Sequence, residues 1–227
     1  MEVGALLLTG GRSRRMGRDK ATLAVGGTTL AARTAAVLHD AGVEGPALEV
    51  GPGVSGLPHL PDGRPGAGPL AAVATGAAAL RRLGWTGPAL VVATDLPLLD
   101  TGLLRWLTGH PCEGSVVPVA GGRPQWLCAR YAGEALAGAE ALATAGNRAM
   151  RDLVAGRPLH LAAQAEWAAA SPAGPAVLAD VDEPPDFQRL GLPEPDFGYA
   201  ELPEPAPSGP APPAAPDRPV PPPALRR

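Results

Sequence analysis

The chain has 227 residues, of which 45% are hydrophobic, so it is long enough to bury the core of one full domain. Its formal net charge of −3 at pH 7 gives no overall basic field, and we expect neither nucleic acid nor a membrane as a partner. The two cysteines, Cys112 and Cys128, form no CxxC pair, so neither a disulfide scaffold nor a zinc site is indicated. Since the sequence has no signal-peptide pattern and no apolar run long enough to span a bilayer, we expect a soluble, cytoplasmic protein.

The predicted elements alternate between strands and helices. A continuous apolar run over residues 3–9 indicates a strand buried on both faces, and it stops at Gly10 and Gly11. A helix over 28–41 follows, with Thr28 or Thr29 as its N-cap and Gly42 as its stop. Further along we expect a strand at 47–50, a helix at 69–83, a strand at 89–93, a helix from Asp100 or Thr101 to about residue 108, strands at 115–119 and 127–131, helices at 132–145 and 147–155, and a last strand at 176–181.

This alternation predicts an α/β fold with a mostly parallel central sheet that helices cover on both faces. We expect a single domain over residues 1–192. From residue 193 the composition changes, because thirteen of the residues between 193 and 227 are proline and few are apolar. Such a segment cannot bury enough surface to offset its ordering entropy, so we expect residues 193–227 to form a disordered Pro-rich tail, or a linker to a further domain.

The loop after the first strand concentrates positive charge. It reads GGRSRRMGRDK over residues 10–20, and Lys20 is the only lysine of the chain. In a parallel α/β sheet, ligands bind beyond the carboxyl ends of the strands, and paired glycines let backbone amides approach anionic oxygens. The sequence has no GxxxxGK[ST] motif and no GxGxxG after the strand, so a P-loop NTPase and an ordinary dinucleotide-binding dehydrogenase are poor fits. The loop therefore indicates a phosphate-binding site of another type.

The string GGRSRRMGRDK resembles the nucleotidyltransferase signature GGxSxRMGxDK, and most specifically that of the molybdenum cofactor guanylyltransferases. The resemblance continues in order along the chain with LPDGRPGAGPLAAV (60–73), VVATDLPLL (91–99), GGRPQWLCARY (121–131) and DVDEPPDF (180–187). It covers nearly all of residues 1–192 and implies a Rossmann-like three-layer nucleotidyltransferase domain. In this chemistry an acceptor phosphate attacks the α-phosphorus of a nucleotide and pyrophosphate leaves, so the protein mainly positions groups and neutralises charge.

The resemblance also implies roles for individual residues. Lys20 is expected at the α-phosphate, with Arg15, Lys20 and Asp95 as the catalytic residues. A compact ammonium can follow an oxygen whose position and charge change during attack, whereas a guanidinium holds two oxygens in a fixed fork. Asp62 is expected at the guanine edge. The full set of expected nucleotide contacts is Leu8, Thr9, Gly10, Gly11, Lys20, Gly51, Asp62 and Asp95.

A metal ion and an acceptor complete the expected site. Asp95 follows a predicted strand, where a carboxylate can hold Mg²⁺ against nucleotide phosphates, and Asp182, rather than Asp180, is expected to join it. Relatives often carry asparagines at these last two positions. Arg123 and Gln125 are expected to face the acceptor, and Trp126 either stacks on the substrate or packs in the core. The histidines show no ligand spacing and have no assigned role: His39, His59, His110 and His160.

The resemblance implies transfer of GMP from GTP to the molybdopterin form of molybdenum cofactor, with release of pyrophosphate. GTP, the molybdenum cofactor, and molybdoenzymes or cofactor-delivery proteins are then the expected partners. Two alternatives remain open: a transferase that uses CTP or another phosphorylated acceptor, and a nucleotide-binding regulator without catalysis. Base choice depends on a few hydrogen bonds near Leu8, Thr9 and Asp62, which the sequence does not fix.

Overall fold

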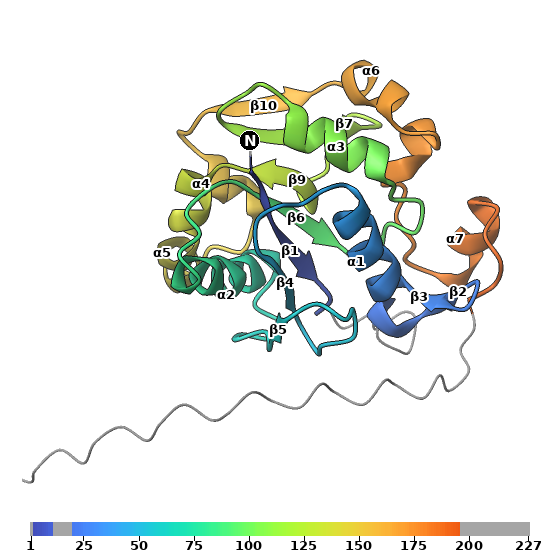
Figure 1. Cartoon of the computed structure of the whole chain (residues 1–227), viewed down its shortest axis with the longest axis horizontal. Helices are drawn as coiled ribbons and strands as arrows, with labels where there is room; N and C mark the ends of the chain where they lie inside the picture. Colours follow the sequence, from blue (N-terminus) through green and yellow to red (C-terminus); the bar gives the residue numbers. More distant parts are fainter. Residues whose placement is uncertain (1, 11–19, 196–227) are drawn as a thin grey trace, which may run out of the picture.

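The computed structural model describes residues 2–10 and 20–195 (Figure 1). The expectations for Gly11, Arg15 and nearly all of the Pro-rich tail therefore concern residues outside the described part. The described residues build an α/β fold around a central mixed sheet. None of the helices in the described ranges is long and apolar enough to cross a membrane.

Parallel pairing dominates the central sheet, as predicted. Its strand order is β10-β7-β9-β6-β1-β4-β5, and only β9 runs antiparallel to its neighbours β6 and β7 along this path. The short β8 pairs with β7, while β2 and β3 form a separate hairpin. The strands are β1 (Gly4–Leu8), β2 (Ala24–Val25), β3 (Thr28–Thr29), β4 (Ala47–Val50), β5 (His59–Leu60), β6 (Ala89–Ala93), β7 (Ser115–Ala120), β8 (Arg123–Pro124), β9 (Cys128–Tyr131) and β10 (Leu159–Ala162).

Helices cover both faces of the sheet, which gives three layers (Figure 1). On one face lie α1 (Leu30–Asp40) and α3 (Thr101–Gly109), and on the other lie α2 (Pro69–Arg82), α4 (Gly133–Ala137) and α5 (Ala139–Thr144). Shorter helices complete the domain: η1 (Lys20–Thr22), η2 (Met150–Val154), α6 (Gln164–Trp167), η3 (Ala168–Ala170), η4 (Gly174–Leu178) and α7 (Pro184–Arg189).

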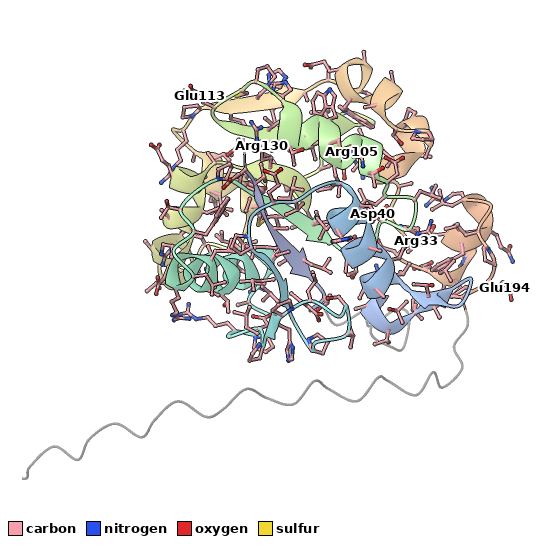
Figure 2. All side chains as sticks on the ribbon, in the orientation of Figure 1. Arg33, Asp40, Arg105, Glu113, Arg130 and Glu194 are labelled. Atoms are coloured by element: carbon pink, nitrogen blue, oxygen red, sulfur yellow. The ribbon has the colours of Figure 1, made fainter. Side chains whose placement is uncertain are left out.

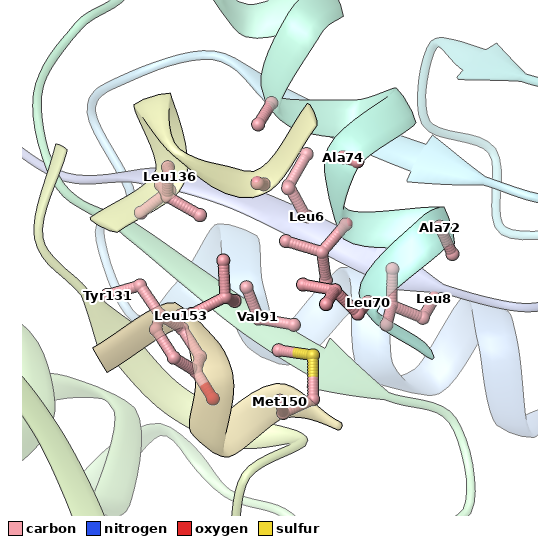
Figure 3. Packing of buried hydrophobic residues seen from close by; sticks show 14 of the residues in the cluster. Leu6, Leu8, Leu70, Ala72, Ala74, Val91, Tyr131, Leu136, Met150 and Leu153 are labelled. Atoms are coloured by element: carbon pink, nitrogen blue, oxygen red, sulfur yellow. The ribbon is translucent and has the colours of Figure 1, made fainter. Parts of the chain in front are cut away.

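The alternation of side chains along β1 explains why its sequence is a continuous apolar run. Leu6 and Leu8 point into the core under α2, which Figure 3 shows, whereas Ala5 and Leu7 point into the core under α1 and α3. Helix α2 packs especially close to the strand, since a Cβ on Gly76 would lie 2.7 Å from Cδ2 of Leu6. The sheet is thus buried between two apolar cores.

Local capping signals place the helices where the sequence predicts them. The hydroxyl of Thr29 accepts the backbone N–H of Ala32 at 3.1 Å, and the Asp100 carboxylate accepts that of Leu103 at 3.0 Å. Gly42 follows α1 with φ of +80°, a conformation that favours glycine. These predicted boundaries are confirmed to within two residues.

The prediction of a last strand at 176–181 is wrong. Residues 174–178 form the 3₁₀ helix η4, and the strand at that edge of the sheet is β10. Pro175 lacks a backbone N–H for a strand ladder, and the side chains of Val177 and Leu178 pack into the core that also contains α1 and α3. The predicted helix at 147–155 is only a 3₁₀ turn, and that at 132–145 is split into α4 and α5 at Gly138.

Candidate active site

The expected nucleotide contacts lie at one edge of the sheet. Because β4, β1 and β6 are neighbouring parallel strands, their carboxyl ends meet at the same edge. Leu8 ends β1 and is followed by Thr9 and Gly10, Gly51 directly follows β4, and Asp95 comes two residues after β6. The structure therefore brings these five residues, drawn from three separate parts of the chain, to one region.

Four of the expected residues form a close group, which we call the base-side group: Thr9, Gly10, Gly51 and Asp62. A Cβ on Gly51 would lie 2.0 Å from Oγ1 of Thr9, so only glycine fits there. A Cβ on Gly10 would lie 3.8 Å from Oδ2 of Asp62, so this carboxylate is beside the end of β1. The other oxygen of Asp62 accepts the backbone N–H of Arg64 at 3.0 Å, which holds the loop before α2 in a turn.

A charged group lies at the end of β6, formed by Lys20, Asp95, Asp180 and Asp182. The ammonium of Lys20 donates to the carboxylate of Asp182, and the backbone N–H of Val181 donates to the carbonyl of Asp95 at 3.0 Å. Burial raises the pKa of Asp95 above its ordinary value; Lys20 opposes this, while Asp180 and Asp182 add to it. The structure thus groups the predicted catalytic lysine with both predicted metal ligands.

An apolar cluster holds the two halves of the charged group together. Leu23, Val25 and Leu30, which follow Lys20, pack against Val181 and Phe187 on either side of Asp182. The start of α7 is fixed as well, because the Asp186 carboxylate accepts the backbone N–H groups of residues 182 and 183 at 2.8 and 2.9 Å. These backbone hydrogen bonds lower the pKa of Asp186. Lys20 and Asp182 therefore meet because the segments that carry them share a core.

Between the base-side group and the charged group the chain passes through residues 11–19. Gly11 and Arg15, expected at the phosphates, belong to this segment and so lie outside the described residues. Gly10 and Lys20 mark its two ends, and each end belongs to one of the two groups.

Sequence reasoning missed Glu49 on β4. Its side chain is fully buried, and its carboxylate accepts hydrogen bonds from Thr9 and from residues 53–55. Burial by itself would raise the pKa of Glu49, but these hydrogen bonds outweigh burial and lower it. The signal was present in the sequence, since a glutamate inside the short apolar strand ALEV requires hydrogen-bond partners.

Two residues of the segment expected to face the acceptor, residues 121–131, make contacts within the protein. Trp126 is half-buried and packs against the core under α2, and its carbonyl accepts the hydroxyl of Tyr131 at 2.8 Å. Core packing is therefore the role the structure gives Trp126. The amide of Gln125 donates to the carbonyl of Arg123 at 3.1 Å, and the Arg123 side chain is exposed.

Two features elsewhere do not belong to this site. A mostly apolar cavity of about 220 Å³ lies at the other end of β6, where Leu80, Trp85 and Leu136 line it.

His110, His160 and Glu166 cluster at the sheet edge. The two imidazole rings are stacked, with centroids 4.7 Å apart and an angle of 24° between the ring planes, so their nitrogen lone pairs do not converge on one metal position. Nδ1 of His110 accepts the backbone N–H of Cys112 at 3.2 Å, and Nε2 of His160 pairs with Glu166 at 2.8 Å. This cluster is better described as two stacked imidazole rings, one of which is hydrogen-bonded to the carboxylate of Glu166.

Comparisons with known proteins identify the family of the chain. Residues 5–166 match the MobA-like NTP transferase domain. The chain is 39% identical over 158 residues to a "Probable molybdenum cofactor guanylyltransferase" of Opitutus terrae, covering 66% of this chain and 76% of the relative.

Two solved structures share the fold at lower identity. "Molybdopterin-guanine dinucleotide biosynthesis protein A" from Archaeoglobus fulgidus has a TM-score of 0.64 at 20% identity, covering 83% of this chain and 96% of that one. A manganese complex of Rv0371C from Mycobacterium tuberculosis has a TM-score of 0.53 at 17% identity, covering 72% and 88%. The family match spans most of the chain, and it includes Lys20, Asp62 and Asp95. The chain therefore belongs to the MobA-like NTP transferase domain family and is a nucleotidyltransferase.

Proposed function

We propose that this nucleotidyltransferase transfers GMP from GTP to the molybdopterin form of molybdenum cofactor and releases pyrophosphate. The name of the Opitutus terrae relative supports the base and the acceptor. The observation that carries the chemistry is the charged group at the end of β6, where Lys20 meets Asp95 and Asp182 beside the base-side group. A nucleotide lying across β4, β1 and β6 would then have its base at one group and its α-phosphate at the other.

In this arrangement the base and ribose contact Leu8, Thr9, Gly10, Gly51 and Asp62. The backbone at the end of β1 offers hydrogen-bonding groups to the base, and the Asp62 carboxylate suits the N–H groups of the guanine edge. The close approach of Gly51 to Thr9 leaves little space between the ends of β4 and β1, where the base would lie.

The phosphates would extend toward Lys20, with Gly11 and Arg15 alongside them. An oxygen of the acceptor phosphate attacks the α-phosphorus, the bond from that phosphorus to the bridging oxygen breaks, and pyrophosphate carries away the electron pair. Lys20 lowers the barrier by neutralising charge on the α-phosphate as the bond forms. In the free protein its ammonium is paired with Asp182, so binding exchanges one anionic partner for another.

The same carboxylates suit a divalent cation, which we propose to be Mg²⁺ held by Asp95 and Asp182. Carboxylate oxygens are the ligands that Mg²⁺ prefers. Burial raises the pKa of Asp95, and the nearby Asp180 and Asp182 carboxylates add to this, so a bound cation would favour the ionised form of Asp95. A metal held there would supply charge neutralisation and orient the α-phosphate. The structural neighbour solved with manganese supports a divalent ion in this fold.

The exposed Arg123 side chain is the group we assign to the acceptor, because its guanidinium can hold a phosphate through two hydrogen bonds. We also propose that the protein acts in the cytoplasm, that molybdoenzymes or cofactor-delivery proteins receive its product, and that residues 1–192 form the whole catalytic unit.

Pyrophosphate release tests this function. The purified chain is incubated with each of the four NTPs, with and without molybdopterin cofactor and Mg²⁺. We expect release with GTP that requires both cofactor and metal. Release with CTP but not GTP would reject the proposed base, and nucleotide binding without turnover under any condition would support a regulator instead.

A further inference from the structure

Among the residues that the structure describes, Glu49 has a carboxylate with five hydrogen bonds beside the base-side group, and the proposed reaction does not use it. Oε1 accepts from Oγ1 of Thr9 at 2.5 Å and from the backbone N–H groups of Gly53 and Val54 at 2.7 and 3.0 Å. Oε2 accepts from the backbone N–H and the hydroxyl of Ser55 at 2.8 and 2.6 Å. The side chain has no exposed surface, so these five donors take the place of water.

These hydrogen bonds join two segments that border the base-side group. Thr9 continues β1, and residues 53–55 belong to the loop that leaves β4 just after Gly51. The loop is also fixed from its other side, because a Cβ on Gly53 would lie 2.8 Å from the His59 ring. Glu49 therefore sets the distance between the end of β1 and the loop after β4.

Stability alone does not require a carboxylate at this position. A buried charge is expensive to desolvate, and a well-packed apolar residue is often as stable or more so. What an apolar side chain cannot do is accept three backbone N–H groups from an irregular loop that has no strand partner for them. A carboxylate gives that loop one defined conformation with respect to Thr9.

We propose that Glu49 is a positioning residue of the nucleotide site, which holds Thr9 and the loop of residues 53–55 so that the base-side group is formed before the nucleotide arrives. This inference rests on the proposed nucleotide binding at this edge of the sheet. A preformed site avoids the entropy of ordering a loop on binding. Glu49 thus affects the affinity for the nucleotide base, and it does not affect the rate of the transfer step at Lys20.

Glu49→Gln tests the proposal, with Glu44→Gln as a matched control. Glu44 is exposed and precedes the same strand at its opposite end. The carboxamide keeps the size of Glu49 but turns an NH₂ group toward donors on one side. In the pyrophosphate assay we expect the KM for GTP to rise about tenfold in Glu49→Gln, with kcat within about twofold, and no change in Glu44→Gln.

Ser55→Ala provides a second test that leaves Glu49 in place, in case Glu49→Gln fails to fold. Ser55 is not among the proposed nucleotide contacts, and its hydroxyl donates to Oε2 of Glu49 at 2.6 Å, so we expect KM to rise about threefold when this hydroxyl is removed. Calorimetric titration with GTP should show matching changes in Kd.

Each of the following outcomes overturns the inference. A folded Glu49→Gln protein with lower thermal stability but unchanged KM and Kd would leave Glu49 a purely structural role. A fall in kcat at unchanged KM would place its effect on the transfer step. A wild-type protein that binds no nucleotide would overturn both this inference and the proposed function, whereas wild-type turnover with an unaffected variant overturns the inference alone.

Discussion

Nζ of Lys20 donates to Oδ1 of Asp182, although these residues are 162 positions apart in the chain. The Lys20 side chain is 16% exposed and that of Asp182 is 52% exposed, so water reaches the pair from the Asp182 side. Ion pairs open to solvent contribute little stability, about 0–1 kcal/mol. In the proposed reaction, phosphate oxygens would therefore displace Asp182 from Lys20 at small cost, and the carboxylate of Asp182 would become available to a cation.

Replacing Lys20 tests its role at the reacting phosphate. Lys20→Arg keeps the charge but substitutes a planar fork for a compact ammonium. We expect the Kd for GTP to change by less than about threefold while kcat falls about 10- to 100-fold, because the interaction strengthens only in the transition state. Calorimetry and pyrophosphate release give the two quantities. Arg33→Lys, an exchange at an exposed position of α1, is the control, and unchanged turnover in Lys20→Arg would refute the assigned role.

Asp182 and Asp180 can be distinguished by their effect on the metal requirement. Asp182→Asn removes one carboxylate from the proposed cation site, and we expect the Mg²⁺ concentration for half-maximal activity to rise about tenfold or more. Asp180→Asn, on the other side of Val181, should change it less. A larger shift in Asp180→Asn than in Asp182→Asn would reverse the assignment of the ligand.

The raised pKa of Asp95 predicts that this residue destabilises the metal-free protein near neutral pH. Burial is its largest cause, and the folded state binds the proton more tightly than the unfolded chain does. Its ionisation therefore costs stability as the pH rises through the raised pKa.

Asp95→Asn should accordingly raise the Tm of metal-free protein at pH 7, with the difference from wild type fading below about pH 4. The same variant should lose transferase activity. Thermal unfolding from pH 3 to 8 measures the effect, with the exposed Glu113→Gln as a control. A variant less stable than wild type at pH 7 would contradict the account.

Arg130 provides a contrasting case, in which a buried charge serves the fold alone. It lies on β9 beneath α3 (Figure 2), and its guanidinium donates to the backbone carbonyls of Leu107, Thr108, His110, Cys112 and Gly114. A lysine cannot reach this set from one point. We expect Arg130→Lys to lower the free energy of unfolding by about 3 kcal/mol and Tm by about 6–12 °C, with the KM for GTP unchanged.

The surface arginine of α3 offers the control for that substitution. Arg105 donates to the backbone carbonyl of Asp40 at 2.6 Å on the exposed side of the same helix (Figure 2). Arg105→Lys should cost less than about 1 kcal/mol. An equal loss of stability in the two variants would show that the hydrogen bonds from Arg130 to buried carbonyls add no more to stability than the surface hydrogen bond of Arg105.

Strands β4 and β6 and helix α2 could be located from the sequence because their signals are local. Each strand is a short, mostly apolar run, and proline and glycine mark the ends of the helix. The strand predicted at 176–181 failed because tertiary contacts decide whether this apolar segment joins the sheet: Val177 and Leu178 pack into the core from η4, which contains Pro175. The edge strand β10 was missed for the same reason, since PLHLAA gains its strand structure from pairing with β7.

In the site too, residues marked by local motifs could be predicted, whereas contacts between distant segments could not. Thr9, Gly10, Gly51 and Asp62 were proposed from motifs, and the structure brings them together. The pairing of Lys20 with Asp182 and the hydrogen bonds of Glu49 depend on tertiary contacts between distant segments, so they could not be derived from spacing.

The central claim, GMP transfer to molybdopterin, is tested most directly by mass spectrometry of the products formed from GTP, molybdopterin cofactor and Mg²⁺. The account predicts one dinucleotide that carries the GMP mass for each pyrophosphate released, and about 10- to 100-fold less of this product from Lys20→Arg over the same time. A dinucleotide formed only with CTP, or nucleotide consumption without any adduct of the cofactor, would contradict it.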